Sequence, residues 1–207
     1  MTNIAAAIAA FALTFVTHAS FFSSETRQPV PIDPQVFEQD ANAPAATGPQ
    51  GIHHAAGLRP ALLSDPKDTP LYNADGATLS FTLGQWLGAK GTAQVTGTGG
   101  GAETVTIRFQ GLIPQGSYSL FENHFDQQPV GFTPLDSSGT TNSFIAGKDG
   151  GATLDITVTP TMTHDNAILL VYHSDHQTHG MMRGTIGVTA HHQLIARIPG
   201  TPSQSQM

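Results

Sequence analysis

Hydrophobic and polar residues alternate along many short stretches between residues 78 and 198. This period-two pattern predicts β-strands with one buried face. It is clearest in residues 103–110, where Val105, Ile107 and Phe109 alternate with polar residues. Similar patterns occupy residues 91–97, 117–124, 142–147, 152–159 and 185–198. The segment 166–173 is apolar at nearly every position, which is typical of a central strand.

Turn residues separate these predicted strands. The glycine run Gly99–Gly101 and the segment Lys148–Gly151 both predict hairpins. Thr82 and Gln85 have the spacing of a capping box, which predicts one short helix over residues 83–88. Because the rest of this region lacks helical periodicity, we expect residues 71–198 to form an all-β domain. The expected architecture is an antiparallel β-sandwich or small Greek-key barrel of about seven to eight strands.

The preceding segment, residues 20–70, has a different composition. It contains eight of the 14 prolines and three of the 22 glycines, and shows neither helical nor strand periodicity. We predict a Pro-rich arm or linker, with apolar residues such as Val36 and Phe37 docking parts of it on the domain. An arm of this kind favours contact with another protein, or with a second copy of the chain, by β-strand addition. Residues 199–207 are predicted to be a polar tail.

The N-terminus contains an apolar run of 13 residues, Ile4 to Val16. This run is too short to span a bilayer and has the length of a signal-peptide core. Small residues around His18 then predict cleavage after Ala19, which would make residues 1–19 a signal peptide and leave no membrane span in the mature chain. The expected location is therefore secreted or periplasmic. The alternative is an N-terminal helix that is not cleaved.

Composition excludes several classes of function. Only 11% of residues are charged and the net charge is -7, which argues against nucleic acid as a partner. There is no cysteine, so disulfides, iron–sulfur clusters and the cysteine-ligated blue-copper centre are excluded. The glycine-rich run near residue 100 lacks the lysine of a phosphate-binding loop, and no organic cofactor is implied.

Candidate chemistry is concentrated in the histidines. The stretch "VYHSDHQTHGMMRG", residues 171–184, spaces three histidines at three-residue intervals. Strand parity predicts that several polar side chains converge at one end of the domain, joined by side chains from the loop after residue 173. The predicted metal ligands are His124, His173, His176, His179, His192 and Glu122.

Two interpretations of these histidines remain open. Imidazoles with a carboxylate suit copper or zinc, and the thioethers of Met181 and Met182 favour Cu(I). An exported, cysteine-free β-domain with such residues is similar in outline to periplasmic copper carriers. No catalytic motif is found, which favours a non-enzymatic protein; an enzyme would be a metal-dependent oxidoreductase. In the alternative interpretation the histidines are structural, and the chain is a non-catalytic module that binds polysaccharide, a partner protein or itself.

Overall fold

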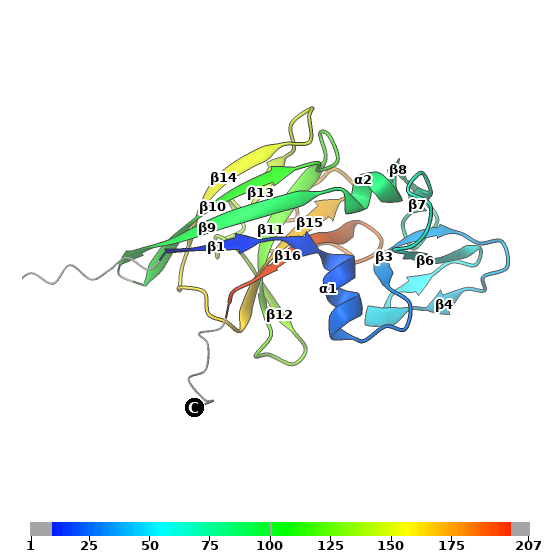
Figure 1. Cartoon of the computed structure of the whole chain (residues 1–207), viewed down its shortest axis with the longest axis horizontal. Coiled ribbons are helices and arrows are strands. Elements are labelled where there is room, and N and C mark those ends of the chain that lie inside the picture. The colour runs from blue at the N-terminus through cyan, green and yellow to red at the C-terminus, as the bar shows by residue number, and fades with distance from the viewer. Residues whose placement is uncertain (1–9, 100, 200–207) are drawn as a thin grey trace, which may run out of the picture.

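The computed structural model describes residues 10–99 and 101–199 and shows a mostly β protein (Figure 1). The predicted all-β class is therefore confirmed. One antiparallel sheet has the strand order β1-β9-β10-β14. Its strands are β1 (Ala10–Thr14), β9 (Lys90–Gly99), β10 (Ala102–Gln110) and β14 (Ala152–Val158). In β10, Val105, Ile107 and Phe109 are buried on one face, as their alternation predicts.

A second antiparallel sheet has the order β12-β11-β15-β16-β2, and β13 also pairs with β11. Its strands are β2 (Val16–Thr17), β11 (Ser117–His124), β12 (Gly131–Pro134), β13 (Ser143–Ile145), β15 (Asn166–His173) and β16 (Ala190–Arg197). Strand β15 is buried along its whole length and lies between β11 and β16, which confirms the predicted central strand.

The main core cluster contains side chains from both of these sheets, including Val95, Ile107, Leu120 and Leu170. Helix α2 (Leu83–Leu87) adds Trp86 to this cluster. Both hydrogen bonds of the capping box between Thr82 and Gln85 are present, as predicted.

The segment predicted to be an irregular arm forms much of a third sheet, ordered β6-β3-β7-β8. These strands are β3 (Ile32–Gln39), β6 (Leu58–Leu62), β7 (Pro70–Tyr72) and β8 (Thr78–Thr82). A small sheet pairs β4 (Ala46–Thr47) with β5 (His53–His54), and the 3-10 helix η1 (Pro49–Gly51) lies between them. The expectation of irregular structure is wrong here, because β3 and β6 pair as antiparallel strands, with a register shift between Asp33 and Phe37 that includes Pro34. The full burial of Val36 and Phe37 agrees with their predicted docking.

The N-terminal segment also takes part in the fold. Strand β1 pairs with β9 over five residues, and Leu13 and Phe15 belong to the main core cluster. Helix α1 (His18–Glu25) follows and contacts β3 and β16 (Figure 1). Residues 1–9 of the predicted signal peptide and residues 200–207 of the predicted tail lie outside the described residues.

The two predicted hairpins have different outcomes. Strands β9 and β10 pair across the glycine run, as expected. The turn at Lys148–Gly151 is tight, with the Gly147 amide donating to the Gly151 carbonyl at 2.8 Å, but it does not make a hairpin. Strand β13 pairs with β11 whereas β14 pairs with β10, so this turn carries the chain from one sheet to the other.

Candidate metal centre

A compact group of potential metal ligands lies where β15 ends and the following loop begins. His173, Asp175 and His179 each offer one ligand atom, and these atoms all lie within 4.8 Å of one another. His173 is the last residue of β15, and the other two residues belong to the loop that leads towards β16. Two imidazoles and a carboxylate form a donor set that suits first-row transition metals.

His173 is fully buried, and a chain of hydrogen bonds determines which ring nitrogen carries the proton. Asn142 donates from Nδ2 to the Leu120 carbonyl, which orients its amide, and its Oδ1 accepts from the Ser143 hydroxyl. Ser143 Oγ therefore accepts from Ser119 Oγ at 2.9 Å, and Ser119 Oγ accepts from His173 Nε2 at 2.8 Å. The proton consequently resides on Nε2, and the lone pair on Nδ1.

The Nδ1 atom of His173 is buried and has no hydrogen-bond partner. An unpaired buried polar atom costs about 1–3 kcal/mol, so such atoms are rare without a function or an unseen ligand. The arrangement matches that of metal-binding histidines, in which the second ring nitrogen donates to an oxygen acceptor and orients the ring.

The other two candidate ligands lie closer to the surface. His179 Nε2 is 3.0 Å from Asp175 Oδ2, and both side chains are 25% exposed. The rings of His173 and His179 have centroids 5.1 Å apart. A metal ion here would have one deeply buried ligand and two half-buried ligands, and would reach solvent on the side of the loop.

The electrostatics keep His173 neutral. Burial, with smaller contributions from His179 and His191, lowers the pKa of His173 to about 4, although nearby Asp175 acts in the opposite direction. At neutral pH the ring is therefore unprotonated at Nδ1. Ligation requires this neutral form, so the site is ready for a cation without having to release a proton from His173.

The strand register separates the predicted ligands. In the β11–β15 pair, His124 is opposite Asn166 whereas His173 is opposite Ser117, seven positions further along. At about 3.3 Å per residue this places the two histidines roughly 23 Å apart along the strands. The predicted convergence of His124 with His173 is therefore wrong. His124 instead contacts Thr133 through Nε2 and Asn166 through Nδ1.

A β-bulge accounts for the position of His192. Leu194 is opposite Leu170, but His192 is opposite Val171, so Gln193 is the extra residue in β16. The predicted parity placed His192 on the same face as Leu194. The bulge reverses that face, and His192 packs beside Phe132 instead of entering the main core.

Glu122 and His176 do not belong to the cluster of His173, Asp175 and His179. Glu122 is buried on the inner side of β11, and burial together with Glu103 and Asp126 raises its pKa to about 7. His176 is exposed and has a positive φ of 58°. Met181 and Met182 are also exposed, at 56% and 70%. Of the six predicted ligands, the structure brings together His173 and His179.

Asp175 was missed as a ligand by the sequence reasoning. The available signal was the position of Asp175, two residues after His173 at the end of a strand. His179 follows in the same loop. Spacing alone did not show that residues 173 and 179 would meet, because residues in an extended loop can lie far apart. The turn at residues 173–176, where the His176 amide donates to the His173 carbonyl at 3.2 Å, brings the loop back.

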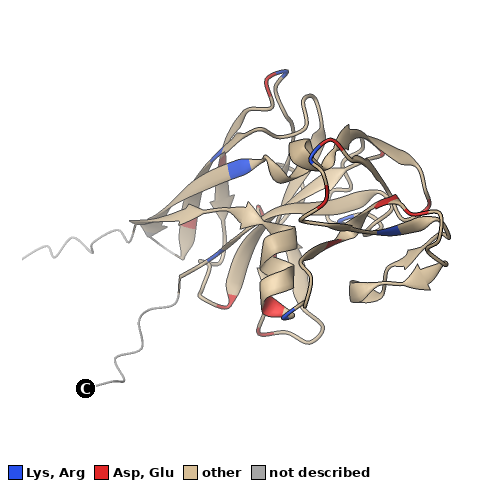
Figure 2. Cartoon of the chain, turned by 45° about the vertical axis from the view of Figure 1, so that its right-hand side comes forward, with Lys and Arg blue, Asp and Glu red and all other residues tan. Residues whose placement is uncertain are grey.

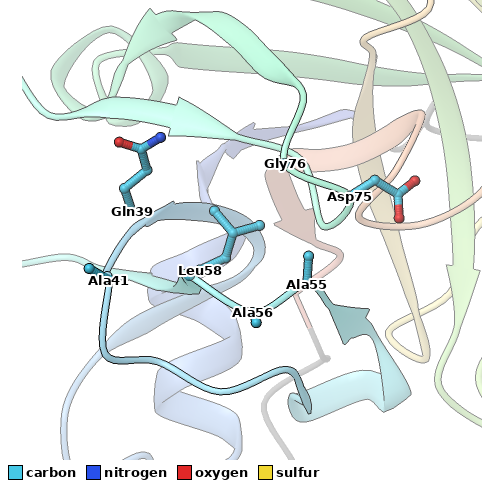
Figure 3. A pocket seen from close by; sticks show the side chains of 8 residues that line it. Gln39, Ala41, Ala55, Ala56, Leu58, Asp75 and Gly76 are labelled. Atoms are coloured by element: carbon cyan, nitrogen blue, oxygen red, sulfur yellow. The ribbon is translucent and has the colours of Figure 1, made fainter.

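Other features of the described residues do not add to this site. A cavity of about 400 Å³ lies among Gln39, Ala41, Ala55, Ala56, Gly57, Leu58, Asp75 and Gly76 (Figure 3). It contains none of the predicted ligands. Within residues 10–99 and 101–199, no helix has both the length and the apolar character needed to cross a membrane.

The sequence comparisons give no relative from which a function could be transferred. No protein-family model matches the chain, and no curated protein has a matching sequence. The functional argument therefore depends on the geometry of the site.

Proposed function

We propose that this protein binds one transition-metal ion through His173, Asp175 and His179. The observation that carries the proposal is the unpartnered Nδ1 atom of the buried His173, which lies in a cluster whose ligand atoms are within 4.8 Å of one another. A bound cation would provide the missing partner and neutralise Asp175. Three protein ligands and a side open to solvent leave a coordination position for water or a further ligand.

The donor set supports zinc or copper(II) as the bound ion. Both accept imidazole and carboxylate ligands, and copper(II) binds such sites more tightly than zinc at equilibrium. The methionines that favoured Cu(I) in the sequence are both exposed, so the choice of ion rests on the imidazoles and the carboxylate. The proposed role is binding or carriage of the ion.

Location outside the cytoplasm, secreted or periplasmic, is part of the same proposal. It rests on the apolar run at residues 4–16. Strand β1 consists of residues 10–14 of that run, and cleavage after Ala19 would remove it from the fold. The location of the protein and the cleavage of the signal are therefore tested separately. Export is tested by fractionating cells that express the untagged protein.

Metal binding is tested by titrating metal-free protein with zinc and with copper(II) in a calorimeter. We expect 1:1 binding, and at a hundredfold excess of free ion over Kd a stabilisation of about 2.7 kcal/mol. The variants Asp175→Asn and His179→Gln should each weaken binding at least about tenfold. His176→Gln is the matched control, because His176 lies in the same loop, is exposed and stands outside the cluster.

Two results would refute the metal proposal. One is unchanged affinity in a variant that carries both Asp175→Asn and His179→Gln. The other is an absence of binding by the wild type at micromolar concentrations of either ion. In that case a non-catalytic binding module becomes the better interpretation, and the outer face of β9, β10 and β14, with exposed Thr92, Thr153 and Thr157, is the surface to examine first.

A further inference from the structure

A second polar cluster lies between helix α1 and the sheet that contains β15 and β16. One of its residues, His192, is opposite Val171, two residues before His173. It consists of His18 at the start of α1, His192 on β16, and Arg183 in the loop between β15 and β16. His18 and His192 are only 5% and 4% exposed, and their ring centroids are 4.9 Å apart. Arg183 lies over the ring of Phe132, with Cζ 3.2 Å from the ring centroid.

The protonation of His192 follows from the amide of Gln35. The backbone N–H of His192 donates to Gln35 Oε1 at 2.7 Å, so the other amide atom must be nitrogen. That Nε2 lies 3.0 Å from His192 Nδ1 and also donates to Gln50 Oε1. His192 Nδ1 therefore accepts a hydrogen bond and has no proton. In the neutral ring, the proton is on Nε2.

This assignment leaves two donors facing each other. His192 Nε2 lies 3.4 Å from Arg183 Nη1, and a guanidinium has no acceptor. In the opposite tautomer, the proton on His192 Nδ1 would face the Gln35 amide nitrogen, also a donor, at the shorter distance of 3.0 Å. The two N–H groups thus converge without an acceptor between them, and the buried Nδ1 of His18 also lacks a partner.

The charges around this cluster are also unbalanced. No carboxylate among the described residues forms an ion pair with Arg183, although the chain has an excess of acidic residues. Charged residues are scattered thinly over the ribbon (Figure 2). Arg183 is half-buried. Burial lowers the pKa of Arg183 only to about 10, so it remains a cation at neutral pH.

We propose that Arg183, His192 and His18 form a binding site for a small oxyanion, the shared chemistry being that of a phosphate, sulfate or carboxylate group. The guanidinium and the imidazole N–H would each donate to an oxygen of the ligand. Arg183 and Phe132 are half-exposed and form the outer side, while the histidines close the inner side. A bound oxyanion would accept hydrogen bonds from the Arg183 guanidinium and from His192 Nε2–H, the two donor groups that face each other.

The test uses the full chain, freed of metal by dialysis, so its result does not depend on the proposed metal centre. Phosphate, sulfate and acetate are titrated separately at constant ionic strength, with calorimetry as the readout. We expect at least one to bind, and Arg183→Gln to weaken that binding about tenfold or more. Arg197→Gln is the matched control, because Arg197 also lies over a phenylalanine ring, Phe125, but far along β16 from the cluster.

Binding of phosphate and sulfate without acetate would identify a tetrahedral oxyanion as the ligand class, whereas binding of acetate would identify a carboxylate. Equal affinity in Arg183→Gln and the wild type would overturn the proposal. So would a wild type that binds none of the three at millimolar concentration. If Arg183→Gln does not fold, NMR spectra of the wild-type protein test the proposal instead. The Nε2–H signal of His192 must shift in NMR spectra as the anion is added, and an unchanged signal rejects the site.

Discussion

Two histidines of this protein carry their proton on the same ring nitrogen, and we propose opposite roles for them. His173 donates from Nε2 into a chain of serines, which leaves a lone pair on Nδ1 for a cation. His192 accepts at Nδ1 from Gln35, which directs its Nε2–H towards Arg183 and suits an anion. At the scale of single residues, neighbouring amides and hydroxyls thus decide the chemistry of each imidazole.

Ser119 is the residue that orients His173. Replacing it by alanine removes the acceptor for the Nε2 proton, so the ring loses its tautomer preference and its orientation. We expect Ser119→Ala to lower metal affinity about 10–100-fold. The measurement is calorimetric titration with zinc, together with NMR assignment of the His173 tautomer. Ser117→Ala, on the same strand and also buried, is the control and should retain the Nε2–H form.

Gly184 lies against the metal centre and has a positive φ of 84°. A Cβ at this position would be 3.2 Å from His179 Nε2 and 3.0 Å from Thr189 Oγ1, so Gly184→Ala should displace His179. We expect loss of metal affinity in addition to a loss of about 1–2 kcal/mol in stability from the strained φ.

Gly57→Ala separates these two effects. Gly57 has a similar φ of 82°, and nothing lies within 4 Å of the position that a Cβ would occupy, so only the backbone strain should appear. Chemical denaturation should therefore show a loss of stability in both variants, larger in Gly184→Ala because of its added contacts, while zinc titration should show weaker binding in Gly184→Ala alone. Wild-type affinity in Gly184→Ala would mean that His179 does not bind the ion.

At the scale of elements, irregularities place the functional side chains. The bulge at Gln193 turns His192 out of the main core, and the loop after β15 returns His179 to the end of the strand. Gly139 touches that loop, since a Cβ there would be 2.6 Å from the Gly180 carbonyl carbon. The segment after β12 thus packs against the loop of the proposed metal site.

Strand β1 provides a prediction about the N-terminus. A chain that lacks residues 1–19 loses its pairing with β9 and the buried side chains of Leu13 and Phe15. Removal of a large core side chain typically costs about 2–5 kcal/mol, so we expect this truncated chain to be strongly destabilised. Urea unfolding of the two forms measures the difference. Removal of residues 1–9 alone, which retains β1, Leu13 and Phe15, is the control.

Intact-mass measurement of the protein from its native compartment shows which form exists. A mature chain that begins at Ser20 and has full stability would contradict the role given to β1. It would also lack His18, and the oxyanion site would then consist of Arg183 and His192.

At the scale of the whole molecule, acid should destabilise the fold. Burial lowers the pKa of His18, His173 and His191 to about 4, and that of His192 well below its usual value. Between pH 6.5 and about 4 these four histidines are therefore protonated in the unfolded chain but neutral in the folded protein. Each then costs about 1.4 kcal/mol of stability per pH unit as the pH falls.

Two carboxyl groups act in the opposite direction. Burial raises the pKa of Asp33 to about 6 and that of Glu122 to about 7, so their contribution to stability grows as the pH falls towards 4. Because the histidines outnumber them by two, we expect a net loss of up to roughly 3 kcal/mol per pH unit. Urea unfolding of metal-free protein at pH 7 and pH 5 measures this; equal stability at the two values would contradict it.

Much of the fold follows from local sequence. The alternation in residues 103–110, the apolar run at 166–173 and the capping box at Thr82 all predicted the elements that form. The segment 20–70 could not be predicted in this way, because its strands are short, interrupted by prolines and paired with residues distant in the chain. Such pairing leaves little periodicity within a single segment.

The sequence by itself determined the all-β class, the absence of thiol chemistry and the concentration of histidine around residues 164–192. Only the tertiary structure decided which histidines meet. Antiparallel register sends His124 to the far end of β11, one bulge turns His192 to another face, and a turn in the loop returns His179 to His173. Local patterns specify which face of an element is buried, but the meeting of side chains depends on register and loop closure, which are set by contacts between distant segments.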